Sequence, residues 1–233
     1  PIRVGLIVSV TGNYTPLGTE DRKAVELAVE QVNAQGGLLG RRVEIVFRDD
    51  KTQPNQAVLA FNAIKRDIDA VIGPVFSNSA LAVEPIAERD EIPYLSLAPV
   101  TEQVRPIKKY IFVTPALSEM YGERYLQYFQ AQKITRVAVA HDRNSSYAVD
   151  GRKTVVDKAA RYGVQVVRDE TYETTTTDFS PIFTRIRDSG AQAFLFWGSG
   201  PPGVTVAKQY AAAGIDIPLM LTGSQASTLW TRP

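Results

Sequence analysis

The sequence predicts an α/β protein made of two units, each a parallel β-sheet covered by helices. Short apolar stretches rich in β-branched residues alternate with segments whose apolar residues recur every three to four positions. Such alternation implies right-handed crossovers and parallel strands. The alternation restarts near residue 117, and 233 residues allow two modest domains at roughly 150 residues per domain. We therefore expect one unit over residues 1–117 and an incomplete second unit over residues 118–233.

The first half of the chain predicts the element order βαβαβαββ. IRVGLIVSV opens it as a strand buried on both faces, and a helix over about 19–35 stops at Gly36-Gly37. The further strands expected are RVEIVFRDD, DAVIGPV, IPYLSLAPV and YIFVTPA. Helices over about 56–66 and 79–89 connect them.

The second half repeats the same alternation. The strands expected are RVAVAHD, VQVVRDE, AFLFWGS and PLMLTG. Helices are expected over about 121–132, 151–162, 179–189 and 204–213. Since parallel sheets bind ligands at the carboxyl ends of their strands, the loops that follow these strands are the places to search for a site.

Composition excludes several classes of function. With 44% hydrophobic and 22% charged residues, a packed core is expected, and 26 basic against 25 acidic residues give a net charge of +1 that does not favour nucleic acid. The absence of cysteine excludes disulfides and thiolate metal sites, and a single histidine excludes paired-imidazole clusters. We expect no metal, no cofactor and no transmembrane segment, because no apolar run approaches about 20 residues. The absence of an initiator Met indicates a processed or trimmed start.

Enzymatic motifs are weak. Gly36, Gly37 and Gly40 close a helix, whereas a dinucleotide fingerprint opens one. His141-Asp142 ends a strand, but no G-x-S-x-G nucleophile elbow accompanies it. Asp49 and Asp50 also end a strand, where a capping or solvated role outweighs magnesium binding. We therefore expect no enzyme, although a doubly wound hydrolase or transferase stays open as an alternative. A DNA-binding repressor core is a further alternative, with no helix-turn-helix to support it.

Small polar residues follow several expected strands. They lie at Ser77–Ser79, Ser96–Thr101 and Arg143–Tyr147. Hydroxyl groups and backbone amides before helix N-termini suit a carboxylate, amide or hydroxyl group of a small ligand. Together they predict a polar cleft for a small molecule.

Several segments resemble one family. Residues 2–58, from IRVGLIVSV to PNQAV, are similar to the start of the periplasmic binding proteins of the branched-chain amino acid transport family, which have the type I periplasmic binding protein fold. Within this stretch, NAQGGLLGR followed by a strand and the DD pair is the specific part of the likeness. VIGPVFSNSA, IPYLSLAP, RVAVAHDRNSSYAVDG, TTDFSPIFTRIRDSGAQAFLF and QYAAAGIDIPLML continue the likeness. The resemblance implies two Rossmann-like lobes joined by a hinge and a cleft that closes on a solute. It also implies a periplasmic or other extracytoplasmic protein that delivers the solute to the membrane permease of an ABC importer.

The resemblance also implies a solute site. The implied contacts in the first lobe and at the entry to the second are Leu17, Ser77, Asn78, Ala98, Pro99, Val100, Thr101 and Tyr147. Ser77 would donate a hydrogen bond to a solute oxygen, Ala98 would offer its carbonyl, and Tyr147 would close over the ligand.

The departures from the family pattern predict an unusual solute. Val100 stands where amino acid binders have a threonine, Gly200 replaces a tyrosine, and Gly223 replaces the acid that pairs with the solute ammonium. A buried ammonium without an anion costs several kcal/mol. We therefore expect a solute other than a standard α-amino acid, such as an aromatic or other carboxylate or amide, with Trp197 as a stacking face.

The length of the chain is a second departure from the family pattern. Members of the family run on by about a hundred residues, so the resemblance implies that the C-terminal third is lacking. A ligand-sensing domain of the same fold, controlling a signalling or regulatory partner, is the alternative function that the sequence leaves open.

Overall fold

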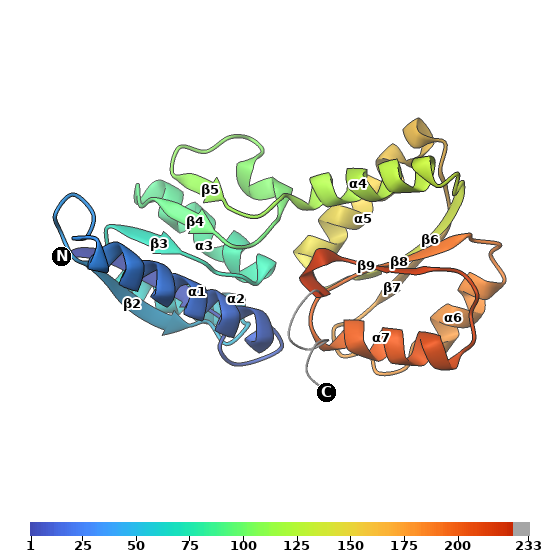
Figure 1. Cartoon of the computed structure of the whole chain (residues 1–233), viewed down its shortest axis with the longest axis horizontal. Coiled ribbons are helices and arrows are strands. Elements are labelled where there is room, and N and C mark those ends of the chain that lie inside the picture. The colour runs from blue at the N-terminus through green and yellow to red at the C-terminus, as the bar shows by residue number, and fades with distance from the viewer. Residues whose placement is uncertain (226–233) are drawn as a thin grey trace. The chain divides into compact units, whose positions relative to one another are not determined.

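The structure, a computed structural model, describes residues 1–225. The chain divides into two compact units, the first spanning Pro1–Pro115 and the second beginning at Ala116. Figure 1 shows the elements of each unit.

The first unit alternates strands and helices throughout. Its elements are β1 (Ile2–Val8), α1 (Thr15–Ala34), β2 (Val43–Asp49), α2 (Pro54–Ile64), β3 (Ala70–Ile72), α3 (Ser77–Arg89), β4 (Tyr94–Ser96), the 3₁₀ turn η1 (Thr101–Val104) and β5 (Ile111–Val113). The strands form one parallel sheet in the order β2-β1-β3-β4-β5. The order reverses direction at β1 and β3, so these strands form the topological switch point of this sheet.

One face of this sheet packs against α2 and α3. Phe61 and Ile64 of α2 and Val83 of α3 are buried against Ile7 and Tyr94 of the sheet. At roughly 1.5–3 kcal/mol for each fully buried large apolar side chain, this layer is the main stabilising contact of the unit. The core therefore fixes the amino-terminal ends of α2 and α3 beside the carboxyl ends of the strands.

The second unit repeats this architecture with four strands. Its elements are α4 (Ser118–Ala131), β6 (Arg136–Asp142), α5 (Ser146–Lys158), the 3₁₀ turn η2 (Ala159–Tyr162), β7 (Gln165–Tyr172), α6 (Ser180–Arg187), β8 (Ala193–Trp197), α7 (Pro201–Ala212), β9 (Leu219–Leu221) and the 3₁₀ turn η3 (Gly223–Gln225). The parallel order is β7-β6-β8-β9, with the switch point at β6 and β8.

Strand β8 is buried on both faces. Phe194 and Phe196 face the cluster that α6 and α7 complete with Phe183 and Tyr210. Trp197 points to the other face, where α4 and α5 lie (Figure 1). The unbroken apolar run AFLFW is the pattern that a doubly covered parallel strand requires.

Every expected strand and helix is present, but several helices begin earlier than predicted. α1 begins at Thr15 instead of 19, α5 at Ser146 instead of 151, and α7 at Pro201 instead of 204. The first turns of α1 and α7 contain proline and small residues, so they give no apolar stripe. The first turn of α5, SYAV, follows the Ser145 cap. Proline suits the first helical turn because its fixed φ is helical and its missing N–H has no partner there. The expected strands near residues 92–100 and 110–116 shorten to Tyr94–Ser96 and Ile111–Val113.

Candidate solute-binding site

The carboxyl ends of β1 and β3 bring two predicted contact segments together. Tyr14, just before α1, packs on Phe76, just before α3, with ring centroids 4.9 Å apart. Leu17 is half-buried in the first turn of α1. Gly18 lies so close to β1 that a Cβ there would be 2.1 Å from the carbonyl oxygen of Ser9. Only glycine permits this approach, which places the start of α1 directly over the strand end.

The amino terminus of α3 offers hydrogen-bond donors at the same edge. Ser77 begins the helix and is 1% exposed, and Asn78 follows it. The Ser79 hydroxyl is fully buried and has no hydrogen-bond partner. A 13-residue helix carries partial positive charge at this end, so the segment favours an anionic or carbonyl oxygen.

The two carboxylates that end β2 serve the fold. Asp49 accepts hydrogen bonds from the backbone N–H of Val10 (3.1 Å) and from the hydroxyl of Thr11 (2.6 Å). Asp50 accepts from the hydroxyl of Ser9 at 2.5 Å. Hydrogen bonds lower the pKa of Asp49 despite opposing desolvation. These acids fasten the loop after β1 to β2, in line with the capping role expected for them.

The loop after β4 turns its carbonyls inward. Ala98, Val100 and Thr101 are buried there, with Pro99 between them. The carbonyl oxygen of Ala98 accepts a hydrogen bond from Gln103 Nε2 at 2.8 Å, and the Ala98 N–H donates to the Ser96 hydroxyl at 3.1 Å.

Gln103 was not among the predicted site residues. In the sequence, Gln103 is simply a polar residue three positions after Val100, and no hydrophobic periodicity predicts the turn that contains it.

In the second unit, the start of α5 carries Tyr147. Ser145 caps this helix by accepting a hydrogen bond from the N–H of Ala148 at 3.4 Å. Tyr147 is 2% exposed, and hydrogen bonding to Thr222 and Ser224 contributes to the electrostatics of its hydroxyl. Burial raises the pKa of Tyr147, with these hydrogen bonds acting in the opposite direction. The phenol is therefore neutral and acts as a hydrogen-bonding group.

The side chain of Trp197 is packed inside the second unit. Its ring is fully buried, 5.8 Å from the ring of Tyr125 and 5.9 Å from that of Tyr147. A Cβ on Gly151 would come within 1.9 Å of it. In this structure the indole packs under the strand-end loops and has no exposed face for stacking. Its Nε1 atom has no hydrogen-bond partner.

A hydroxyl cluster surrounds the carbonyl oxygen of Gly198. It accepts hydrogen bonds from Thr222 Oγ1 (2.9 Å), Ser224 Oγ (3.0 Å) and Gln225 Nε2 (3.0 Å). The hydroxyl of Ser199 donates to Ser224 at 2.9 Å. Sequence reasoning missed this cluster, although the TGSQ segment after the last strand was a signal of the right chemistry.

Gly200 and Gly223 differ in whether the structure requires a glycine. Gly200, before α7, has φ 72° and ψ −154°, a conformation essentially restricted to glycine. A Cβ on Gly223 would meet nothing closer than the ring of Tyr121 at 3.6 Å, an ordinary contact. The absence of a side chain at 200 follows from the backbone, whereas position 223 has room for one.

Carboxylates near these loops are engaged by neighbouring groups. Asp142 ends β6 and accepts from the hydroxyl of Thr174 at 2.5 Å and the N–H of Asn144 at 2.9 Å. Glu173, after β7, pairs with Arg143. Within residues 116–225, the loops after β6, β8 and β9 contain no acidic residue. This edge of the second unit is rich in neutral hydroxyl and amide groups.

A groove of about 590 Å³ runs along α4 beside this cluster. Its lining residues are Tyr121, Arg124, Tyr125, Gln127, Tyr128, Ala131 and Met220. The lining is mainly aromatic and aliphatic, and Tyr121 is also the nearest side chain to Gly223. Apolar surface thus adjoins the polar strand-end loops.

Among residues 1–225, no group of three or more His, Asp or Glu side chains is arranged to hold a metal ion. No helix in that range combines the length and apolar character needed to cross a membrane.

A family comparison accounts for this arrangement. The profile of the periplasmic binding protein family matches residues 1–232. The chain belongs to the periplasmic binding protein family. Its family and structural neighbours are solute-binding proteins rather than enzymes.

Curated relatives bind branched-chain amino acids. The leucine-, isoleucine-, valine-, threonine- and alanine-binding protein of Pseudomonas aeruginosa is 28% identical over 225 residues, covering 94% of this chain and 59% of that protein. The Leu/Ile/Val-binding protein of Escherichia coli is 26% identical over 222 residues, covering 94% and 60%. The chain thus spans about three-fifths of the length of these relatives.

Solved structures share the fold. A type 1 periplasmic binding protein from Bordetella pertussis Tohama I superposes with a TM-score of 0.84 at 29% identity, over 94% of this chain and 62% of that one. An ABC transporter solute-binding protein from R. palustris in complex with benzoate gives a TM-score of 0.85 at 24% identity, over 95% and 62%.

Proposed function

We propose that the chain is the solute-binding component of an ABC importer and works outside the cytoplasm, in the periplasm or another extracytoplasmic compartment. It captures a small organic solute at strand-end loops and delivers it to a membrane permease. Membership of the periplasmic binding protein family supports this role. The helix amino termini after β1 and β3, and the hydroxyl cluster after β8 and β9, supply the chemistry that such a solute needs.

The solute that we propose is a carboxylate or amide without an ammonium group, aromatic acids included. The absence of an acidic residue from the loops after β6, β8 and β9 carries this proposal, together with the open position at Gly223. An ammonium desolvated there would lack a counter-charge. A carboxylate, by contrast, suits the amino terminus of α3 and its buried hydroxyl groups. The benzoate-bound R. palustris protein illustrates such a solute in this fold.

The test is a thermal-shift screen of the purified chain, followed by calorimetric titration. The screen pairs each amino acid with the acid that lacks its amino group: leucine with 4-methylpentanoate and phenylalanine with 3-phenylpropanoate, with benzoate added. A ligand at 100 times its Kd stabilises the folded state by about 2.7 kcal/mol, a readily measured shift.

We expect the deaminated or aromatic acids to raise the melting temperature and the amino acids to leave it unchanged. A shift by leucine alone would overturn the proposed solute class while leaving the binding function intact. A chain that responds to no member of the panel would contradict the proposal for these solutes.

A further inference from the structure

We infer that Gln103 is a specificity-determining positioning residue: it engages the carbonyl groups of Ala98 and Val100 in the loop after β4, so that these two acceptors are not available to the solute. The inference rests on the proposed function and deepens it, because it names the residue that makes this part of the site unfavourable for an ammonium.

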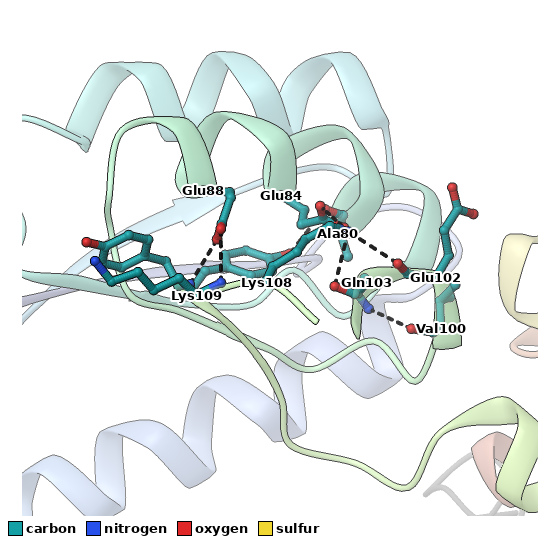
Figure 2. A network of polar contacts seen from close by, with 10 residues as sticks. Ala80, Glu84, Glu88, Val100, Glu102, Gln103, Lys108 and Lys109 are labelled. Carbon is teal, nitrogen blue, oxygen red and sulfur yellow. Dashed lines mark hydrogen bonds and ion pairs between the residues drawn. The ribbon is translucent and has the colours of Figure 1, made fainter. Parts of the chain in front are cut away.

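The first step concerns the acceptors of the loop. Gln103 Nε2 donates to the carbonyl oxygen of Ala98 at 2.8 Å. It also donates to that of Val100 at 3.4 Å (Figure 2). Each oxygen has a second donor: the Ser96 hydroxyl reaches Ala98 O at 3.5 Å, and the Gln103 N–H reaches Val100 O at 3.3 Å. A carbonyl oxygen has two lone pairs, so the acceptor capacity of both groups is used inside the unit.

The second step concerns what keeps Gln103 in place. Its side chain is fully buried, and its own main-chain carbonyl accepts a hydrogen bond from Lys108 Nζ at 3.2 Å. The same ammonium bonds the carbonyl oxygen of Glu102 at 3.2 Å and pairs with Glu84 of α3 at 2.7 Å. Figure 2 shows these groups gathered between α3 and the turn η1. Glu84 is 5% exposed, and removing one partner of a buried pair is costly, so the turn is rigidly attached to α3.

A further contact fixes the end of the same segment. The Glu88 carboxylate accepts hydrogen bonds from the backbone N–H groups of Lys109 and Tyr110, both at 2.9 Å. Two acids one helical turn apart on α3 therefore hold the whole segment from η1 to β5. The loop cannot easily turn its carbonyls outward without breaking these contacts.

The consequence is a donor-rich edge. With the Ala98 and Val100 acceptors satisfied internally, the groups of this edge that can meet a solute are the backbone N–H groups at the amino terminus of α3. These favour carboxylate or carbonyl oxygens. An ammonium would have to compete with Gln103 for Ala98 O, at the cost of leaving a buried amide donor unsatisfied.

The experiment measures Kd for two ligand pairs that differ only in the amino group: leucine against 4-methylpentanoate, and phenylalanine against 3-phenylpropanoate. Titrations compare the unaltered chain with Gln103→Met, which keeps the length of the side chain and removes its donor. Gln31→Met, an exposed position near the end of α1, is the matched control.

We expect Gln103→Met to reduce the preference for the deaminated acid by about tenfold, the worth of one hydrogen bond to a charged group. The control keeps the preference of the unaltered chain. Equal weakening of both ligands would show a structural role only and overturn the inference, as would an unchanged ratio.

Two results separate this inference from the proposed function. If the unaltered chain prefers the amino acids, the proposed solute class fails, whatever Gln103→Met does. If it prefers the acids and the ratio does not respond to Gln103→Met, only the present inference fails. Should Gln103→Met fail to fold, NMR of the unaltered chain decides: we expect slow solvent exchange of the Gln103 side-chain amide protons, and free exchange would contradict the contact.

Discussion

The two strand-end edges of this protein have the same topology but different chemistry. In the first unit, main-chain groups dominate: helix amino termini, a glycine against a carbonyl, and loop carbonyls bound by Gln103. In the second unit, side chains dominate: hydroxyl groups converge on the Gly198 carbonyl above the buried Trp197. The comparison teaches that two sheets of the same α/β plan can differ in the chemistry of their strand ends, which a few loop residues determine.

Removing the aromatic support of the second edge has the largest expected effect. Trp197→Ala deletes a fully buried indole that packs on Tyr125, Tyr147 and Gly151, and we expect a loss of about 3–5 kcal/mol in the free energy of unfolding. Urea denaturation followed by far-UV circular dichroism measures it. Phe112→Ala, at a side chain 53% exposed in the first unit, is the control. A loss below about 1 kcal/mol would show that the edge does not depend on this ring.

A charge introduced at Gly223 tests the chemical difference between the edges. The open space there accommodates a side chain, so Gly223→Asp places a carboxylate beside Tyr121. We expect the affinity for leucine or phenylalanine to rise by about tenfold, or roughly 1.4 kcal/mol, because the ammonium gains a counter-charge. Gly223→Asn, of the same size and neutral, should not reproduce the gain. Calorimetric titration distinguishes the two, and equal behaviour of both variants would rule out the charge as the cause.

The first unit contains a half-buried acid, Asp21, that works against its stability. Asp21 on α1 has a carboxylate oxygen without a hydrogen-bond partner, and burial, with a smaller contribution from Glu20, raises its pKa to about 6. Because this pKa lies above the unfolded value of 3.8, the folded state binds the proton more tightly, and stability declines as pH rises from about 4 to above 6.

We expect Asp21→Asn to stabilise the chain at pH 8 by about 1–2 kcal/mol, after allowance for partial solvent screening. At pH 4 the variant and the unaltered chain should melt alike. Melting curves at both pH values measure this, and a stabilisation that is equal at pH 4 and pH 8 would refute the titration of Asp21 as its origin.

The second unit should respond to pH in the opposite direction, with the smallest effect. His141 is 7% exposed, its Nδ1 has no hydrogen-bond partner, and burial lowers its pKa despite Asp169, whose carboxylate lies 3.7 Å away. The folded state therefore resists protonation, and its stability falls as pH drops below the ordinary value of 6.5.

His141→Gln should flatten this acidic dependence. Melting temperatures are measured from pH 7 to pH 5 in chains that also carry Asp21→Asn, with and without His141→Gln. The Asp21→Asn substitution removes the opposing titration of Asp21. An unchanged slope in the double variant would exclude His141 as its source.

Sequence alone predicted the fold well and the site only in part. The strands were visible as apolar runs, and the order of elements determined which loops share an edge. Helix starts were missed because their first turns carry Pro or polar residues instead of an apolar stripe. Gln103 could not be predicted, since its bonds depend on a 3₁₀ turn that brings an amide back onto two carbonyls.

Two glycines show most clearly what cannot be predicted from the sequence alone. Gly200 and Gly223 look alike in the sequence. The positive φ at position 200 requires glycine, whereas open space surrounds Gly223. Trp197 likewise ends an apolar strand, and only the packing of α4 and α5 determines that its ring is covered.

The place of β1 in its sheet has a consequence for biosynthesis. β1 is an interior strand, yet both of its neighbours are encoded after it, with Ile2 paired to Val43 and Val4 to Ala70. During translation, the run IRVGLIV therefore leaves the ribosome well before any partner exists to cover it. An unpaired apolar strand of this kind is prone to aggregate until its partner strands have been synthesised. The apolar run of β1 therefore stays exposed until Val43–Asp49 and Ala70–Ile72 have been synthesised.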